Sequence, residues 1–193
     1  MKIGCLCNNA TIVNENVLGQ PTEGALLYLA KRAGVPDLRK THQRLKEWPF
    51  SSESKMMIVQ STPSDFKNNF GPITQRITHY AKGSPEAIIE KCKFFRKSLN
   101  VDKITINDEA AIADFTAEEK HKFLQISSTM GKRGLRVLGL AEGSNENDFI
   151  FTGLFALMDP LRVGVDIAIR TMMDSGVNVI MITGDSRETA CSI

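Results

Sequence analysis

The chain has 193 residues, 42% of them hydrophobic and 24% charged, which suits a globular protein with one large or two small domains. Its formal charge of +2 argues against a nucleic-acid surface, and its longest apolar stretch, residues 149–158, is too short for a membrane-spanning helix. The four cysteines show neither a disulfide framework nor a zinc-ligand spacing, so we expect reduced thiols and no metal site.

The first part of the chain predicts one helix followed by a pair of strands. Residues 22–34 place apolar side chains on one helical face and end in a glycine, which is typical of a helix and its stop. Residues 45–50 and 55–61 are expected to form two short strands around a Ser-Ser-Glu-Ser turn. A polar loop is expected over residues 63–72.

The next segment, RITHYAKGSPEAIIEKC, joins a strand to a capped helix. Residues 77–80 alternate like a half-buried strand, and Ser84-Pro85-Glu86 supply an N-cap serine, a proline at the first helical position and an acid. Lys82 and Gly83 therefore lie where the strand ends. Glycine lets a planar ligand approach the main chain, and lysine offers a mobile positive charge for phosphates. The same dipeptide also suits an ordinary turn.

Three further elements complete the first domain. A capping box at residues 116–119, Thr-Ala-Glu-Glu, predicts a helix that ends near Gly134. LRVLGLAE and FIFTGLFALM, residues 135–142 and 149–158, predict two strands, the second of them buried on both faces. Together with the preceding elements they indicate an antiparallel sheet with helices on it.

The pattern changes after Met158. VGVDIAIRTMMDSG predicts an amphipathic helix, VNVIMITGD predicts a fully apolar strand, and SRETA begins another helix. Strand, helix and strand in this order indicate a right-handed parallel unit. We therefore expect an α/β chain: residues 1–158 form an α+β domain with a mainly antiparallel sheet, and residues 159–193 form part of a parallel, Rossmann-like domain. Because the chain stops just after a helix begins, we expect it to be a fragment.

Thr183-Gly184-Asp185 lies where the apolar strand meets a helix N-terminus. Ligands of open α/β sheets bind at such strand ends, and phosphates favour the free N–H groups of a helix N-terminus. The same residues also suit a plain turn in which Asp185 or Ser186 caps the helix.

Two other residues, Arg136 and Phe50, have two interpretations each, whereas Glu23 and Lys55 have an ordinary structural one. Arg136, at a strand start, can bind a phosphate through its forked donors or be a solvated strand end. Phe50 can stack on a base or belong to the core. Glu23 suits the first turn of its helix without any ligand, and Lys55 has the character of a surface lysine.

Common catalytic and nucleotide-binding motifs are absent. His42, His79 and His121 have no serine or cysteine partner at a recognisable spacing, and we assign them no catalytic role. Neither G-x-x-x-x-G-K-[ST] nor G-x-G-x-x-G occurs, so a P-loop enzyme or a dinucleotide-binding domain is unsupported.

Seven strings nonetheless follow one another along the whole chain in an order that resembles the P-type cation-transporting ATPases. They are CNNATI, GQPTEGAL, PFSSESK, YAKGSPEAIIEKC, GLRVLGLA, MDPLR and VNVIMITGDSRETA. CNNATI, PFSSE and GLRVLGLA most resemble the secretory-pathway, Golgi-type calcium and manganese pumps. The resemblance implies that residues 1–158 are the nucleotide-binding domain. It also implies that residues 159–193 begin the second part of the phosphorylation domain, with a fold of the haloacid dehalogenase type.

The resemblance further implies how the first domain binds ATP. Phe50 would stack on adenine, and Glu23 would face the amino edge of the base. Lys82 and Gly83 would lie deepest in the pocket. Phosphate charge would be neutralised by two side chains, Lys55 and Arg136.

For the second domain the resemblance implies a role in phosphoryl transfer. Thr183 and Gly184 would hold the transferring phosphoryl group, and Asp185 would lie near the nucleotide and Mg²⁺. Asp159-Pro160 would be the hinge between the domains. Two positions depart from the pattern: Leu161 stands where many relatives have a proline, and Ser52 where some calcium pumps have an arginine.

Several family motifs do not occur in this chain. They are the Asp-Lys-Thr-Gly-Thr that carries the phosphorylated aspartate, the Gly-Asp-Gly magnesium motif, the Thr-Gly-Glu loop and the transmembrane helices. We therefore expect the chain alone to bind ATP without hydrolysing it, because it lacks the nucleophile. The remaining phosphorylation, actuator and transmembrane domains would be its partners in the parent protein. The parent would move Ca²⁺ or Mn²⁺ across a Golgi membrane, with this part on the cytoplasmic face.

Two alternatives come from other classes of protein. A soluble phosphatase of the haloacid dehalogenase type would also suit Thr183-Gly184, but it needs an Asp-x-Asp pair that this sequence lacks. The other alternative is a non-catalytic interaction domain that keeps the fold and binds no nucleotide.

Overall fold

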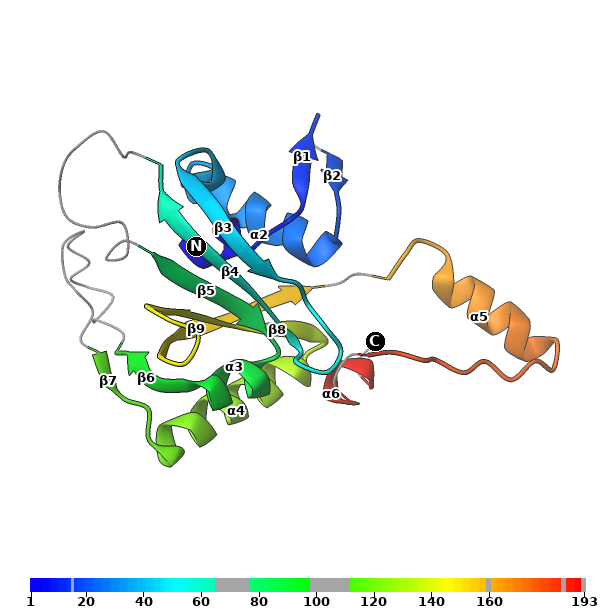
Figure 1. The fold of residues 1–193 in the computed structure, drawn as a ribbon. Helices are drawn as coiled ribbons and strands as arrows, with labels where there is room; N and C mark the ends of the chain where they lie inside the picture. Colours follow the sequence, from blue (N-terminus) through cyan, green and yellow to red (C-terminus); the bar gives the residue numbers. More distant parts are fainter. Residues whose placement is uncertain (15, 65–76, 98–111, 159–160, 185–186, 192–193) are drawn as a thin grey trace, which may run out of the picture.

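A computed structural model describes residues 1–14, 16–64, 77–97, 112–158, 161–184 and 187–191 (Figure 1). Within these residues seven strands form one sheet, in the order β3-β4-β5-β8-β9-β6-β7. Their bounds are β3 His42–Trp48, β4 Met56–Pro63, β5 Thr78–Gly83, β6 Cys92–Arg96, β7 Ile112–Asp114, β8 Leu135–Gly143 and β9 Phe149–Met158. Every pair is antiparallel except β6 with β9. The expected α/β class with a mainly antiparallel sheet is confirmed.

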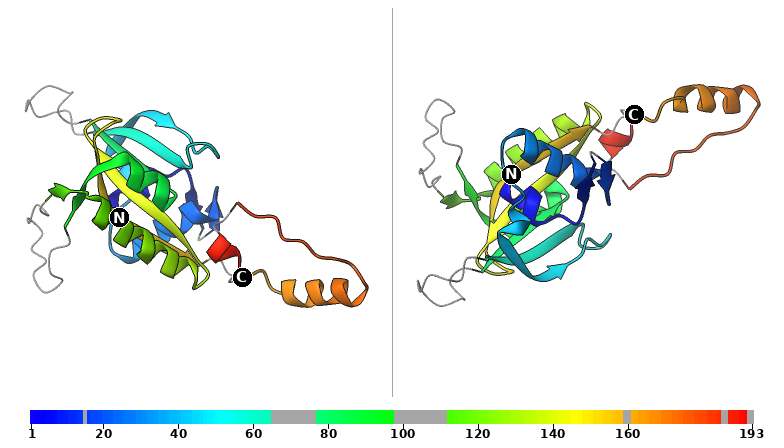
Figure 2. Two further views of the ribbon diagram at one scale, coloured as in Figure 1. Left: turned by 90° about the horizontal axis from the view of Figure 1, so that it is seen from below. Right: turned by 90° about the horizontal axis from the view of Figure 1, so that it is seen from above.

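Helices cover both faces of this sheet (Figures 1 and 2). On one face lie α1 (Lys2–Leu6) and α2 (Pro21–Arg32), together with a hairpin of β1 (Thr11–Val13) and β2 (Asn16–Leu18). A 3-10 turn, η1 (Leu38–Lys40), follows α2. The other face carries α3 (Pro85–Lys91) and α4 (Ala117–Gly131). Because successive side chains of a strand point to opposite faces, the sheet supplies both cores.

The core under α3 and α4 combines aliphatic residues such as Ile88 and Ile89 with a group of aromatic rings. Phe95, Phe115, Phe123 and Phe151 lie with ring centroids between 4.9 and 6.1 Å apart, most of them tilted or edge to face. This geometry brings the positive edge of one ring to the negative face of another. The core between α1 and the sheet contains Cys7, Met57, aliphatic residues and Tyr80, which is 1% exposed, and a further small cluster of Cys5, Ala10, Leu27 and Ala30 lies between α1 and α2.

Several local signals in the sequence are observed directly. Ser84 caps α3 by accepting a hydrogen bond from the backbone N–H of Ala87, and Thr116 caps α4 through the N–H of Glu119. The helix predicted from Thr22 is observed as α2. The helix predicted from the capping box is α4, which ends at Gly131 rather than near Gly134. The short elements α1, β1, β2, β6 and β7 were not predicted. The expected loop at residues 63–72 lies mostly outside the described residues.

The prediction that the strand over residues 149–158 is buried on both faces is wrong for its second half. Phe149 and Phe151 are buried, whereas Met158 is 75% exposed. The reason is that β6 pairs with β9 only as far as Phe151, and beyond it the described part of the chain gives β9 a single neighbour, β8.

The C-terminal segment extends away from the sheet (Figure 1). Its helix α5 (Val165–Asp174) forms as predicted and is followed by Gly176 at φ 81°. The predicted strand that follows is not observed, since residues 177–183 have no regular secondary structure and Ile182 is 94% exposed. A buried parallel strand needs hydrogen-bonding neighbours on its edges, and residues 161–184 supply none.

A short last helix, α6 (Arg187–Ala190), contacts α4. The expected hinge, Asp159-Pro160, lies outside the described residues, and the division into two domains at residue 158 stays a prediction. No helix of the described segments is long and apolar enough to cross a membrane.

Candidate nucleotide site

Lys82 and Glu23 come together where β5 ends beside the first turn of α2. Along β5, Ala81 points into the core under α3 and α4, so its neighbours Tyr80 and Lys82 point to the opposite face, toward α1 and α2. Lys82 is only 8% exposed, and its Nζ lies 2.5 Å from Glu23 Oε1. A strand therefore delivers a buried ammonium group to the start of a helix.

The other carboxylate oxygen of Glu23 is also bound. The backbone N–H of Asn9 donates to Glu23 Oε2 over 2.9 Å. Glu23 lies in the first turn of α2, where the helix dipole favours a negative charge. Its two oxygens thus have different partners, a cation from the sheet and a peptide group from the loop after α1.

Arg136 joins the same place from β8. Its Nη1 donates to Thr22 Oγ1 over 3.1 Å, one residue before Glu23. We call the group Thr22, Glu23, Lys82 and Arg136 the α2 site. Three of the residues singled out in the sequence, Glu23, Lys82 and Arg136, are therefore brought together although they are far apart in the chain.

Gly83 and Lys55 meet on the adjoining strand edge. A Cβ at Gly83 would lie 2.3 Å from the backbone oxygen of Lys55, and the N–H of Ser84 donates to that oxygen over 2.9 Å. Lys55 itself has φ 51°, in the left-handed region. The glycine is therefore needed for the close approach of two strands, a reason that the sequence did not indicate.

Phe50 and Lys55 lie at the two ends of a tight turn. The turn is closed by Ser51, whose Oγ lies 2.8 Å from Ser54 Oγ and whose carbonyl accepts from the N–H of Lys55. Phe50 is 62% exposed. An exposed ring held by a closed turn is free to stack on a planar ligand, since no packing has to be broken.

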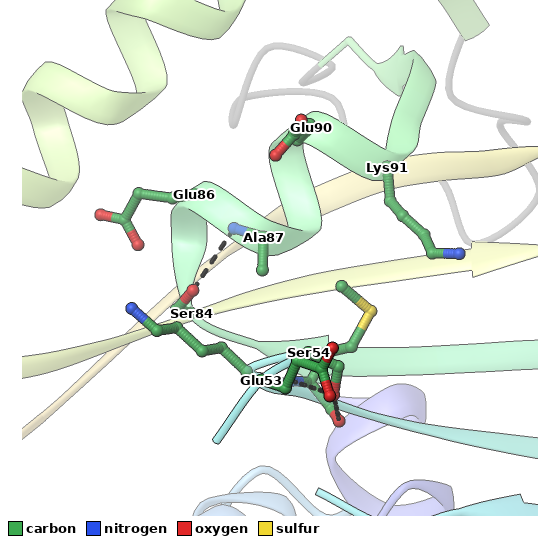
Figure 3. A pocket seen from close by; sticks show the side chains of 9 residues that line it. Glu53, Ser54, Ser84, Glu86, Ala87, Glu90 and Lys91 are labelled. Atoms are coloured by element: carbon green, nitrogen blue, oxygen red, sulfur yellow. Dashed lines mark hydrogen bonds between the residues drawn. The ribbon is translucent and has the colours of Figure 1, made fainter. Parts of the chain in front are cut away.

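Two hollows lie near these residues. The larger, of about 670 Å³, lies between this turn and α3 (Figure 3). In Figure 3 Glu86, Glu90 and Lys91 project from α3, and Glu53 and Ser54 belong to the turn. The smaller, of about 330 Å³, is lined by residues of α1, the following loop and β3. Lys55 lines the larger hollow, whereas Phe50 and Lys82 line neither of the two. A hollow shared by the side chains of Phe50 and Lys82 therefore stays a prediction.

Thr183 and Gly184 lie in the extended C-terminal segment rather than in the α2 site. Both are exposed, and the space where a Gly184 side chain would be is open. Asp185 lies outside the described residues. The roles of all three in phosphoryl transfer remain predictions.

Residues of the loop after α1 also belong to this region, although the sequence did not single them out. Cys7 is fully buried and donates from Sγ to the carbonyl of Met57. Burial raises the pKa of its thiol to about 12, against the opposing influence of the Lys82 charge. The next residue, Asn8, is 1% exposed and bonds to the backbone of Glu23. Only the resemblance of CNNATI to a family string pointed to this loop.

Comparison with known proteins identifies the class. Residues 1–164 match the sequence model of the family described as "P-type ATPase, cytoplasmic domain N". The chain belongs to this family, which confirms the resemblance seen in the sequence.

The relatives are calcium-transporting ATPases by name. The chain is 36% identical to calcium-transporting ATPase type 2C member 1 of Mus musculus and 38% identical to type 2C member 2 of Homo sapiens, in both cases over all its 193 residues. It is 34% identical to calcium-transporting ATPase 1 of Saccharomyces cerevisiae. The chain covers 19%, 18% and 20% of these three proteins, so it spans about a fifth of their length.

Proposed function

We propose that this chain is the ATP-binding part of a P-type calcium-transporting ATPase of the secretory-pathway kind. The observation that carries the proposal is the α2 site, in which a buried lysine, a buried glutamate and an arginine from three distant segments meet. The family match and the names of the relatives support the same function.

Each part of ATP has a suitable group in the proposed complex. Adenine offers a flat ring to Phe50 and an amino group to Glu23, whose carboxylate can only accept hydrogen bonds. The triphosphate is anionic, and Lys82, Lys55 and Arg136 supply positive charge. Gly83 follows Lys82 at the end of β5, where its lack of a side chain allows the close approach of the backbone of Lys55 and Met56.

Mg²⁺ enters this proposal with the nucleotide. Among the described residues no group of three or more His, Cys, Asp or Glu could hold a metal ion. When bound with the nucleotide, Mg²⁺ would supply positive charge against the negative charge that develops in phosphoryl transfer. The chain itself would contribute the carboxylate of Asp185.

In the parent protein the function depends on proximity. This part would hold ATP, and closure about Asp159-Pro160 would bring the terminal phosphate in line with an aspartate outside the chain. Thr183 and Gly184 would hold the phosphoryl group as it moves. The aspartyl-phosphate would then shift the conformational equilibrium of the actuator and membrane domains, which would move Ca²⁺ or Mn²⁺ across a Golgi membrane.

A titration of the 193-residue chain tests ATP binding. We expect ATP, with Mg²⁺ chelated, to shift the amide resonances around Phe50 and Lys82. Lys82→Ala should weaken the affinity for ATP by about tenfold or more, because a charge-assisted contact contributes about 1.5–3 kcal/mol.

The control is Lys31→Ala, an exposed lysine at the far end of α2, which should bind ATP like the parent. Because Lys82→Ala leaves Glu23 buried without its partner, circular dichroism must show a folded variant, and Lys82→Gln provides a milder change. Unchanged ATP affinity in both folded variants would refute the site assignment. Phosphate release from the chain alone would instead favour the phosphatase alternative.

A further inference from the structure

The loop between α1 and β1 holds Glu23 through a fully buried asparagine. Asn8 Nδ2 donates to the carbonyl oxygens of Gly4 and Glu23, both over 2.8 Å. Its Oδ1 accepts from the N–H of Ala10 over 2.9 Å. Both donors and the acceptor of the side-chain amide are therefore used, and Asn8 is 1% exposed.

The residue after Asn8 reaches the carboxylate of Glu23. The N–H of Asn9 donates to Glu23 Oε2, while Lys82 binds Oε1. Asn8 thus fixes the peptide of Glu23 and also the loop whose next N–H orients the Glu23 side chain. Gln20, the N-cap residue of α2, makes no side-chain capping bond, so this loop supplies the anchor that the helix start lacks.

The loop is in turn held from the edge of the sheet. Arg44 of β3 donates to the carbonyl oxygens of Leu6 (3.0 Å) and Asn8 (2.8 Å). It also bonds to Asn9 Oδ1, and the side-chain amide of Asn9 donates to Glu47. The loop therefore lies between β3, which contributes Arg44 and Glu47, and Glu23 of the α2 site.

We propose that Asn8 is a positioning residue for nucleotide binding, which acts by holding the Glu23 carboxylate in the orientation that accepts the amino group of adenine. The inference rests on the proposed function of the α2 site. It adds a residue that touches no part of the nucleotide. Its effect should therefore be visible in base selectivity, because the loop it fixes orients the group that meets the base.

A double-mutant cycle tests this role with four chains: the parent, Asn8→Ala, Glu23→Ala and the double variant. Asn8→Ala should weaken ATP binding about tenfold in the parent and reduce the preference for ATP over GTP. In the Glu23→Ala background the same change should alter the affinity for ATP by at most about twofold, because Asn8 acts through Glu23 and the two changes are therefore not additive. The melting temperature should fall in both backgrounds.

Two further variants keep the test decisive. Asn8→Asp retains the acceptor for the Ala10 N–H and removes the donors to Gly4 and Glu23, so it should also weaken ATP binding. It provides the measurement if Asn8→Ala does not fold. Asn145→Ala removes a hydrogen-bonded asparagine from the turn after β8 and should leave the affinity for ATP unchanged.

The outcomes separate the two proposals. An equal loss of affinity in both Glu23 backgrounds, or unchanged affinity and selectivity in folded Asn8→Ala and Asn8→Asp, would overturn the role of Asn8. Loss of binding in Lys82→Ala alongside parental binding in both Asn8 variants would overturn only this inference. A folded parent that binds no ATP would overturn the proposed function as well.

Discussion

An ion pair joins two of the charged groups of the α2 site, Lys82 and Glu23. The side chains of Lys82 and Glu23 are only 10% and 12% exposed, so each has lost most of its water and has the other as partner. Removing one partner of such a pair costs about 3–5 kcal/mol, because the other charge stays buried. ATP can replace both contacts, since it carries an amino group and phosphates. The pair therefore holds both side chains in position before ligand binds.

A second buried group at the residue scale makes stability depend on pH. His79 is 5% exposed, lies against Trp48 with ring centroids 5.9 Å apart, and its Nδ1 has no hydrogen-bond partner in the described part of the chain. Burial lowers its pKa, as does Lys46, whereas Glu146 and the backbone of Ser144 act in the opposite direction. The unfolded chain therefore binds a proton at higher pH than the folded chain does.

We accordingly expect the contribution of His79 to stability to be complete above its unfolded pKa and to be lost as pH falls below it. Urea unfolding at pH 7.5 and 5.5 measures the loss, which His79→Phe should reduce while keeping the ring contact with Trp48. His121→Gln, at an exposed position of α4, should leave the loss as in the parent. An equal loss in His79→Phe and the parent would contradict the assignment.

The sequence predicted individual functional side chains better than the residues with which they pair. Lys82 could be predicted because it lies between a strand pattern and a helix N-cap. Its pairing with Glu23, 59 residues away, depends on how α2 packs on the sheet. Asn8 gave no signal of its own, since a buried asparagine is recognised only by the backbone groups that it satisfies.

At the scale of elements, the end of β5 is shaped by the start of β4. A methyl group at Gly83 would lie 2.3 Å from the Lys55 carbonyl oxygen and 2.7 Å from Met56 Cα. Both neighbours are backbone atoms, which cannot move aside as a flexible side chain does. The turn that carries Phe50 is therefore held against the strand that carries Lys82.

Gly83→Ala should therefore destabilise the fold by about 1–3 kcal/mol, the usual cost of overpacking, and displace the turn after Phe50. The matched change is Gly4→Ala, where the methyl group would meet Leu26 at 3.5 Å, an ordinary contact, and should cost much less. Chemical unfolding gives both values. Similar stabilities of the two variants would show that the strands can separate without cost.

Elements with strong local signals were predicted, and those fixed by distant pairing were not. α3 and α4 begin with capping residues that are recognisable in the sequence, and in both helices the capping hydrogen bond is formed. β1 and β2 are three residues each and have too short a pattern to detect. β6 depends on a parallel pairing with β9, more than 50 residues later, which no local pattern reveals. The strand expected over residues 177–185 had a clear pattern, but residues 177–183 have no neighbouring strand in the part of the chain that the structure describes.

At the scale of the whole molecule, the segment after Met158 exposes an unusual amount of apolar surface. Exposed apolar side chains on α5 include Ile167 and Met173, and those of the following stretch include Ile180 and Ile182, at 80% and 94%. Contiguous exposed apolar surface favours association. The sheet and its two helical layers, in contrast, have complete cores without this segment.

A chain that ends at Met158 should therefore keep the sheet and the parental affinity for ATP, while associating less at high concentration, because the exposed apolar segment is gone. Circular dichroism, an ATP titration and light scattering measure the three properties. Ile180→Glu with Ile182→Glu in the full chain is the matched change and should also reduce association, but by less, since it removes part of the apolar surface and leaves that of α5. Unfolding of the shortened chain would mean that the contact of α6 with α4 stabilises the first domain, and the boundary near residue 158 would then be wrong.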